Sequence, residues 1–135
     1  MAVRLTFKAE FSISSTMADE KDLGNGEYQV RTDSMNEGGT WRTRVADGAT
    51  DQQINLDNIA DAKWLYLRIT PVVETDPSPT LSIKLDAVGN TPISLTSPTD
   101  KKEGMMMLTT TGLSALYVSN ASGYAVDLTV SVAGD

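Results

Sequence analysis

The sequence begins with a regular alternation of apolar and polar residues. The apolar positions are Val3, Leu5, Phe7, Ala9, Phe11 and Ile13. A period of two over eleven residues is typical of a β-strand with one apolar and one polar face, whereas a helix would scatter these residues around its circumference. Residues 1–14 therefore predict a strand, and its polar face suits it to the edge of a sheet or to a partner-binding arm.

Shorter alternating runs follow, separated by turn-forming residues. They predict further strands at 27–31, 41–45, 81–85, 93–95, 105–108, 116–118 and 124–132. Residues 64–69 are apolar on both faces over most of their length, which predicts a central strand covered on both sides. The polar, glycine-containing segments 15–26 and 33–40 predict loops, and Asp57 could cap one helical turn in 57–63.

This pattern predicts an all-β fold with little helix. About eight or nine short strands at even spacing favour a single antiparallel β-sandwich or jelly-roll-like domain over residues 1–135. A chain of 135 residues, 40% of them hydrophobic, is long enough for one such domain with an ordinary core.

The composition narrows the chemistry that this domain could perform. The chain has no cysteine and no histidine, which excludes disulfides, thiol nucleophiles, Ser-His-Asp triads and His/Cys zinc sites. Its net charge of −7 disfavours binding to nucleic acid or to an anionic membrane. We therefore expect no enzyme, and we assign no catalytic residue and no cofactor.

Two acidic or polar motifs have simpler interpretations than a functional site. The acidic segment 19–27 is the best calcium candidate, but it lacks EF-hand spacing, and Lys21 stands where a ligand belongs. We interpret it as a solvated loop and assign no metal ligand. Asn120-Ala121-Ser122 fits the glycosylation pattern, but with the following glycine it is typical of a hairpin turn.

Two sets of residues are candidates for an interface. They are the methionines Met105, Met106 and Met107 and the basic residues Arg4, Lys8, Arg42 and Arg44. Three consecutive methionines on a strand put side chains on both faces, so at least one should point away from the core, unless the strand is central and packed on both faces. The basic residues could form a strip that attracts an acidic partner, or could pair with nearby carboxylates.

The last part of the chain resembles known proteins in its pattern. The segments INLDNIADAKWLYLRI, LSIKLDAVGNTPISL and GMMMLTTTGLSALYVSNASGYAVDLTVSVAGD, at 54–69, 81–95 and 104–135, resemble small virion structural proteins of tailed bacteriophages, of the capsid decoration (cement) or head-fibre type. The resemblance implies a β-sandwich that forms homo-oligomers, commonly trimers, on the outside of the particle.

These observations lead to one expected function and one alternative. We expect a capsid decoration or cement protein, made in the host cytoplasm, that binds the outer face of the major capsid protein lattice and stabilises the head. An acidic protein suits this outer surface better than the DNA-filled interior. The alternative is a head, neck or tail fibre module that recognises host glycans, for which Trp41 or Tyr28 could supply the aromatic ring.

Overall fold

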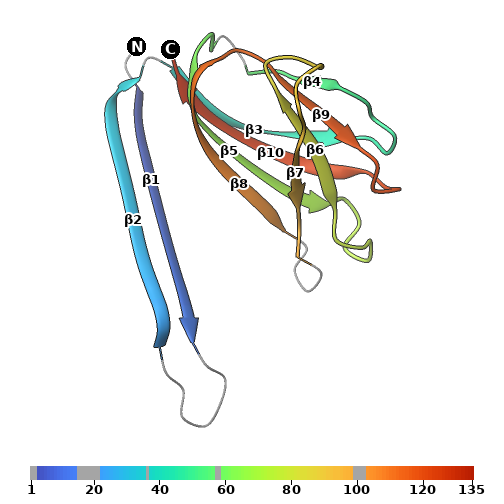
Figure 1. Ribbon diagram of the computed structural model, residues 1–135, viewed down its shortest axis with the longest axis horizontal. Coiled ribbons are helices and arrows are strands. Elements are labelled where there is room, and N and C mark those ends of the chain that lie inside the picture. The colour runs from blue at the N-terminus through green and yellow to red at the C-terminus, as the bar shows by residue number, and fades with distance from the viewer. Residues whose placement is uncertain (1–2, 15–21, 36, 57–58, 99–102) are drawn as a thin grey trace.

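The computed structural model describes residues 3–14, 22–35, 37–56, 59–98 and 103–135, with side chains from residue 38 onward. These residues form ten strands and no helix (Figure 1). The strands are β1 (Val3–Ser14), β2 (Asp22–Met35), β3 (Glu37–Val45), β4 (Gln52–Ile54), β5 (Ala62–Pro71), β6 (Thr80–Leu85), β7 (Ile93–Thr96), β8 (Gly104–Leu113), β9 (Leu116–Asn120) and β10 (Val126–Gly134).

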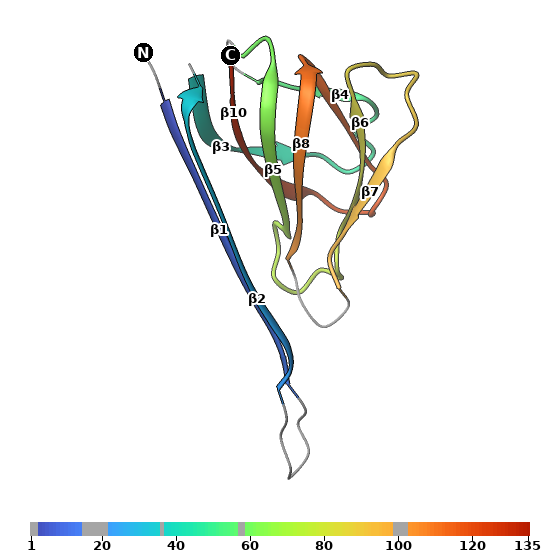
Figure 2. The same cartoon turned by 60° about the vertical axis from the view of Figure 1, so that its left-hand side comes forward.

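Eight of the strands form an antiparallel β-sandwich, which confirms the predicted fold class. Sheet I has the strand order β3-β10-β5-β8, and sheet II has the order β4-β9-β6-β7. The remaining strands, β1 and β2, pair with each other in a long hairpin, here called the arm. Figures 1 and 2 show the two sheets facing each other and the arm running away from them.

The core follows from the alternation of apolar residues on facing strands. Every second residue of β5 and β10 in sheet I, and of β6 and β9 in sheet II, is buried. These residues are Leu65, Leu67, Ile69, Val126, Leu128, Val130, Leu81, Ile83, Leu116 and Val118. Their burial between the two sheets supplies the main hydrophobic stabilisation of the sandwich.

The edges of the two sheets meet at a glycine. A Cβ atom at Gly104, at the start of β8, would lie 2.8 Å from the main-chain oxygen of Thr96 and 2.9 Å from the nitrogen of Ser97. Only a residue without a side chain allows β8 of sheet I to approach the end of β7 in sheet II this closely. Gly104 therefore closes one side of the sandwich.

Both predicted N-terminal loops are partly wrong, because the strands are longer than their side-chain pattern indicates. Residues 22–26, predicted as loop, belong to β2 and pair with residues 11–14 of β1. In the segment 33–40, predicted as a loop, residues 33–35 belong to β2 and residues 37–40 belong to β3, where Gly38 pairs with Ala133 and Gly39 with Val132. A Cβ at Gly38 would lie 3.2 Å from the oxygen of Val132, so this glycine allows close strand pairing rather than a turn.

The segment 64–69 is a central strand as predicted, but it is covered on only one side. In β5, Leu65 and Leu67 are buried in the sandwich, whereas Arg68 on the outer face is exposed and Trp64 is half-buried. The outer face of β5 therefore carries large apolar side chains although no second sheet of the sandwich covers it. The predicted helical turn is also wrong for residues 59–63, which form a bend and the start of β5; its proposed cap, Asp57, lies outside the described residues.

Candidate interaction surfaces

The outer face of sheet I gathers aromatic, methionine and arginine side chains in adjacent rows. Strand pairing places Arg42, Thr129, Arg68 and Met105 in one row across β3, β10, β5 and β8. The next row contains Tyr66 and Met107. We call the residues Arg42, Trp64, Tyr66, Arg68, Met105 and Met107 the open face.

The three methionines alternate between the two sides of β8. Met105 is 61% exposed on the open face, whereas Met106 packs against the hydrophobic core. Met107 is half-buried and shares its side of the sheet with Met105. The alternative prediction of a central strand packed on both faces is wrong, because β8 is the edge strand of sheet I.

The predicted basic residues divide between the open face and the arm. Arg42 and Arg44 share the outer face of β3, and Arg44 Nε lies 3.2 Å from Asp127 Oδ1 on the neighbouring strand. Arg42 has no ion pair within the part of the chain that the structure describes. Arg4 and Lys8 lie on β1, and their side chains are outside the described part.

Sequence reasoning missed a third basic residue on this face. Arg68 of β5 forms an ion pair with Glu103 and lies in the same row as Arg42 and Met105, next to Met105. The signal was present in the run Trp64–Ile69, where every second position carries Trp, Tyr or Arg.

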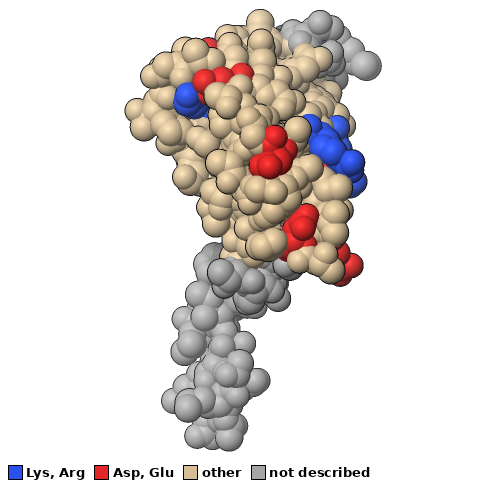
Figure 3. Space-filling model, turned by 90° about the vertical axis from the view of Figure 1, so that its right-hand side faces the viewer, with Lys and Arg blue, Asp and Glu red and all other residues tan. Residues whose placement is uncertain are grey.

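On the side of the molecule drawn in Figure 3, charged side chains form small separate groups on a mostly uncharged surface.

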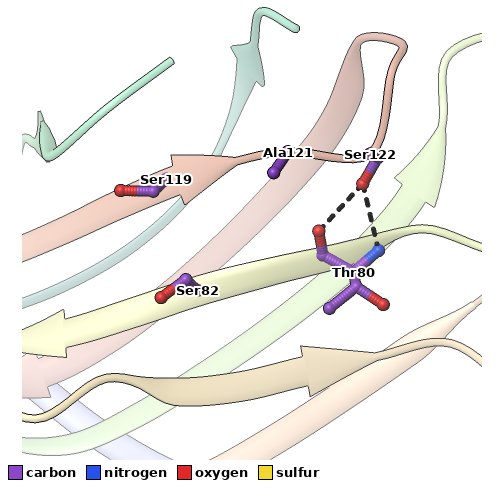
Figure 4. A pocket seen from close by; sticks show the side chains of 5 residues that line it. All are labelled: Thr80, Ser82, Ser119, Ala121 and Ser122. Atoms are coloured by element: carbon purple, nitrogen blue, oxygen red, sulfur yellow. Dashed lines mark hydrogen bonds between the residues drawn. The ribbon is translucent and has the colours of Figure 1, made fainter. Parts of the chain in front are cut away.

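The outer face of sheet II carries a small hollow lined by hydroxyl groups. Its volume is about 180 Å³, and its lining residues are Thr80, Ser82, Ser119, Ala121 and Ser122 (Figure 4). Ser122 Oγ donates a hydrogen bond to the main-chain oxygen of Thr80 at 2.9 Å and accepts one from its nitrogen at 3.3 Å. These bonds tie the turn after β9 to β6, so the Ser122 hydroxyl has a structural role.

The aromatic residue Trp41, a candidate for glycan binding, does not line this hollow. Trp41 points into the sandwich and packs against its core, and Tyr28 lies on β2, where side chains are outside the described part. The lining of the hollow contains no aromatic ring. The structure therefore gives no observation that favours the glycan-binding alternative.

The structure also bears on metal binding and on membrane crossing. Within the described ranges, no group of three or more acidic residues is placed to hold a metal ion. In the calcium candidate segment, residues 22–27 are part of β2, and residues 19–21 lie outside the described residues. No helix in the described part of the chain is long and apolar enough to cross a membrane.

Comparison with protein-family models, with curated proteins and with solved structures found no match to this chain.

Proposed function

We propose that this protein is a capsid decoration protein of a tailed bacteriophage, which binds the outer face of the major capsid protein lattice and stabilises the head. The observation that carries the proposal is the open face. It combines an exposed methionine, Met105, with two aromatic rings and two arginines on one regular sheet surface. Aromatic residues, methionine and arginine are the residue types enriched in protein–protein interfaces.

The charge distribution favours an acidic protein surface as the partner of the open face. The whole chain has a net charge of −7, yet Arg42 and Arg68 lie in the same row as Met105, separated from each other only by Thr129 of β10. Glu103 neutralises part of this charge through Arg68, which leaves Arg42 as the cation that a partner carboxylate would meet. Such complementarity sets the orientation of docking and its rate more than its affinity.

The proposed role needs no chemical step. A protein that binds the assembled lattice, and not its separated subunits, stabilises the lattice by mass action. Each contact can be weak, because many copies act on one shell and an oligomeric decoration protein engages several sites together. The resemblance of residues 54–135 to small phage virion proteins is consistent with this role.

The test is to mix the purified protein with expanded, DNA-free heads of the phage that encodes it and to image them by electron cryomicroscopy. Ordered density repeated over the capsid lattice is the expected result. Density confined to the tail vertex would instead assign the protein to the neck or tail. Heads without any added density would overturn the proposal.

Two matched variants test whether the open face is the docking surface. Met105→Asp places a charge on the most exposed apolar residue of the open face, and Val88→Asp places the same charge on another exposed apolar residue, 49% exposed beyond β6. We expect Met105→Asp to lower occupancy of the heads about tenfold or more and Val88→Asp to leave it unchanged. Equal occupancy for both variants would exclude the open face as the docking surface.

A further inference from the structure

We propose that the arm is a self-association device: its apolar face packs against the arm of a second copy of this chain. This inference goes beyond the proposed function and does not depend on it, because it concerns the purified protein alone. The observations that carry it are the register of the hairpin, its separation from the sandwich and the distribution of charge.

The register separates the residues of the arm into two faces. Residues paired across an antiparallel hairpin share a face, and the face changes at every residue. The pairs Phe7–Val30, Ala9–Tyr28, Phe11–Gly26 and Ile13–Gly24 therefore define one face, and the pairs Thr6–Arg31, Lys8–Gln29, Glu10–Glu27 and Ser12–Asn25 define the other. The first face is apolar along the arm, and the second is polar.

The arm is not a layer of its own sandwich. β1 and β2 form a separate two-stranded sheet, and β1 comes near the sandwich at β3. Residue 36 alone separates β2 from β3, so this approach is at the base of the arm, and the rest of the hairpin extends away from both sheets (Figures 1 and 2). A two-stranded hairpin is at best marginally stable in water unless something covers its apolar face.

The charge distribution favours a second arm as the cover. The two strands of the arm carry three basic residues (Arg4, Lys8 and Arg31) and four acidic residues (Glu10, Asp22, Glu27 and Asp33). Their net charge is −1, the segment 15–21 between them adds another −1, and the remaining −5 of the total of −7 lies in residues 37–135. Two acidic bodies repel each other, whereas two nearly neutral arms do not, so the arms are where two copies can meet at the smallest electrostatic cost.

The length of the arm adds to this advantage. β1 contains 12 residues, which at about 3.3 Å per residue gives an arm about 40 Å long. A contact between arms can therefore hold the acidic bodies several screening lengths apart, because the screening length is about 8 Å at physiological ionic strength. Two hairpin sheets packed face to face at about 10 Å would form a small sandwich of their own, with the apolar faces inside.

The size of the contact predicts an equilibrium rather than a permanent complex. A face about 40 Å long and two strands, or about 10 Å, wide covers about 400 Å² on each partner, or about 800 Å² in total, which is below the size of stable specific interfaces and typical of weak ones. We expect the apparent mass in solution to rise with protein concentration from the 14.5 kDa of one chain to a dimer or trimer. The number of copies depends on whether two or three arms share one apolar core, and either number fits the proposal.

The absence of cysteine from the natural sequence makes a direct test possible. Single cysteines are introduced on the apolar face (Leu5→Cys, Ala9→Cys and Ile13→Cys) and on the polar face (Thr6→Cys, Lys8→Cys and Ser12→Cys). Under mild oxidation, at least one apolar-face variant should form a disulfide-linked dimer rapidly, and the polar-face variants should remain monomeric on a non-reducing gel. Equal cross-linking from both faces, or from neither, would overturn the proposal.

Charged substitutions supply a second test with a matched control. The double variant Phe7→Asp/Phe11→Asp changes the apolar face, and Thr6→Asp/Ser12→Asp adds the same charge to the polar face. Sedimentation equilibrium should show only monomer for the first variant. The second variant should self-associate as strongly as the natural protein does. The proposal would be overturned if the natural protein is monomeric at all concentrations, or if Phe7→Asp/Phe11→Asp still forms oligomers. The fluorescence of Trp41 and Trp64 shows in each case whether the sandwich is folded.

Discussion

The side-chain amide of Asn120 donates a hydrogen bond to the main-chain oxygen of Tyr124 at 2.8 Å. The same nitrogen lies 3.2 Å from the main-chain oxygens of Val45 and Ala46, and Asn120 Oδ1 accepts a hydrogen bond from the nitrogen of Ser122 at 3.0 Å. Asn120 is only 1% exposed. One buried amide therefore joins the end of β9 in sheet II to the end of β3 in sheet I.

Replacement of Asn120 by alanine should destabilise the sandwich strongly. The change leaves main-chain oxygens of Val45 and Tyr124 buried without their amide donor, which costs about 2–4 kcal/mol in the free energy of unfolding. Urea denaturation followed by tryptophan fluorescence measures this cost. The control is Asn90→Ala, because Asn90 donates one exposed hydrogen bond, to the oxygen of Leu85 at 2.7 Å, and should cost less than about 1 kcal/mol. Similar losses for both variants would contradict this role of Asn120.

Asn120 also shows what the sequence could and could not reveal. Its motif predicts a turn, and the turn is present, but the alternation of side chains contains no information on which main-chain oxygens a buried amide will meet. Local patterns predict the sandwich class from alternating runs with a period of two, and they predict a central strand at 64–69 from its continuous apolar run, although only one face of that strand is covered in the sandwich. They underestimate β2 and β3, where Gly24 and Gly38 lie in paired strands that are determined by the partner strand.

The candidate surface depends even more on long-range pairing. The sequence of the triplet 105–107 predicts a possible interface, because consecutive residues of a strand alternate in direction. Its neighbours Tyr66 and Arg68 come from a strand almost forty positions earlier in the sequence, and Arg42 comes from another strand again. Only the sheet order β3-β10-β5-β8 brings these residues together. The alternation of residues within each strand does not reveal which strands are neighbours in the sheet.

Adjacent methionines on β8 should have opposite roles. Met106 packs against the core, so Met106→Ala removes buried contacts and should lower the free energy of unfolding by about 2 kcal/mol. Met105 is 61% exposed, so Met105→Ala should change stability by less than about 0.5 kcal/mol but weaken binding to expanded heads. Thermal denaturation and a head-binding assay on the same two variants measure both effects. Loss of binding in proportion to loss of stability would argue against a docking role for Met105.

The two arginines on the outer face of β3 should differ in their contribution to docking. Arg44→Gln removes a cation that already pairs with Asp127 at 3.2 Å, whereas Arg42→Gln removes the cation that shares a row with Arg68 and Met105 on the open face. Both variants change the net charge equally. We expect Arg42→Gln to weaken binding to expanded heads by about tenfold, which corresponds to about 1.4 kcal/mol, and Arg44→Gln to have a smaller effect. Added salt should reduce the difference, and a larger effect of Arg44→Gln would reverse this assignment.

The ion pair between Lys63 and Asp135 should give a pH dependence in the alkaline range. The hydrogen bond to Asp135 raises the pKa of Lys63 above its ordinary value of 10.5, partial desolvation opposes this shift, and the charges of Asp135 and Asp61 add to it. A pKa raised in the folded state gives stability that is complete below the pKa of the unfolded chain and is lost as the pH rises through the folded value. The stability difference between the natural protein and Lys63→Met should therefore be constant between about pH 6 and about pH 9, and should fall as the pH rises through the folded pKa of Lys63. A difference that grows as the pH rises would contradict the sign of the shift.

Removal of the whole arm should leave the sandwich folded and soluble, whereas removal of its first strand alone should cause aggregation. The arm strands pair only with each other, so deletion of residues 1–35 takes away no strand pairing from sheets I and II. We expect this variant to be monomeric and to keep a cooperative thermal transition. Deletion of residues 1–14 instead leaves β2 without its partner and exposes an unpaired strand edge, which promotes aggregation. Light scattering during heating distinguishes the two variants, and an unfolded 1–35 deletion variant would show that the arm is required for the sandwich itself.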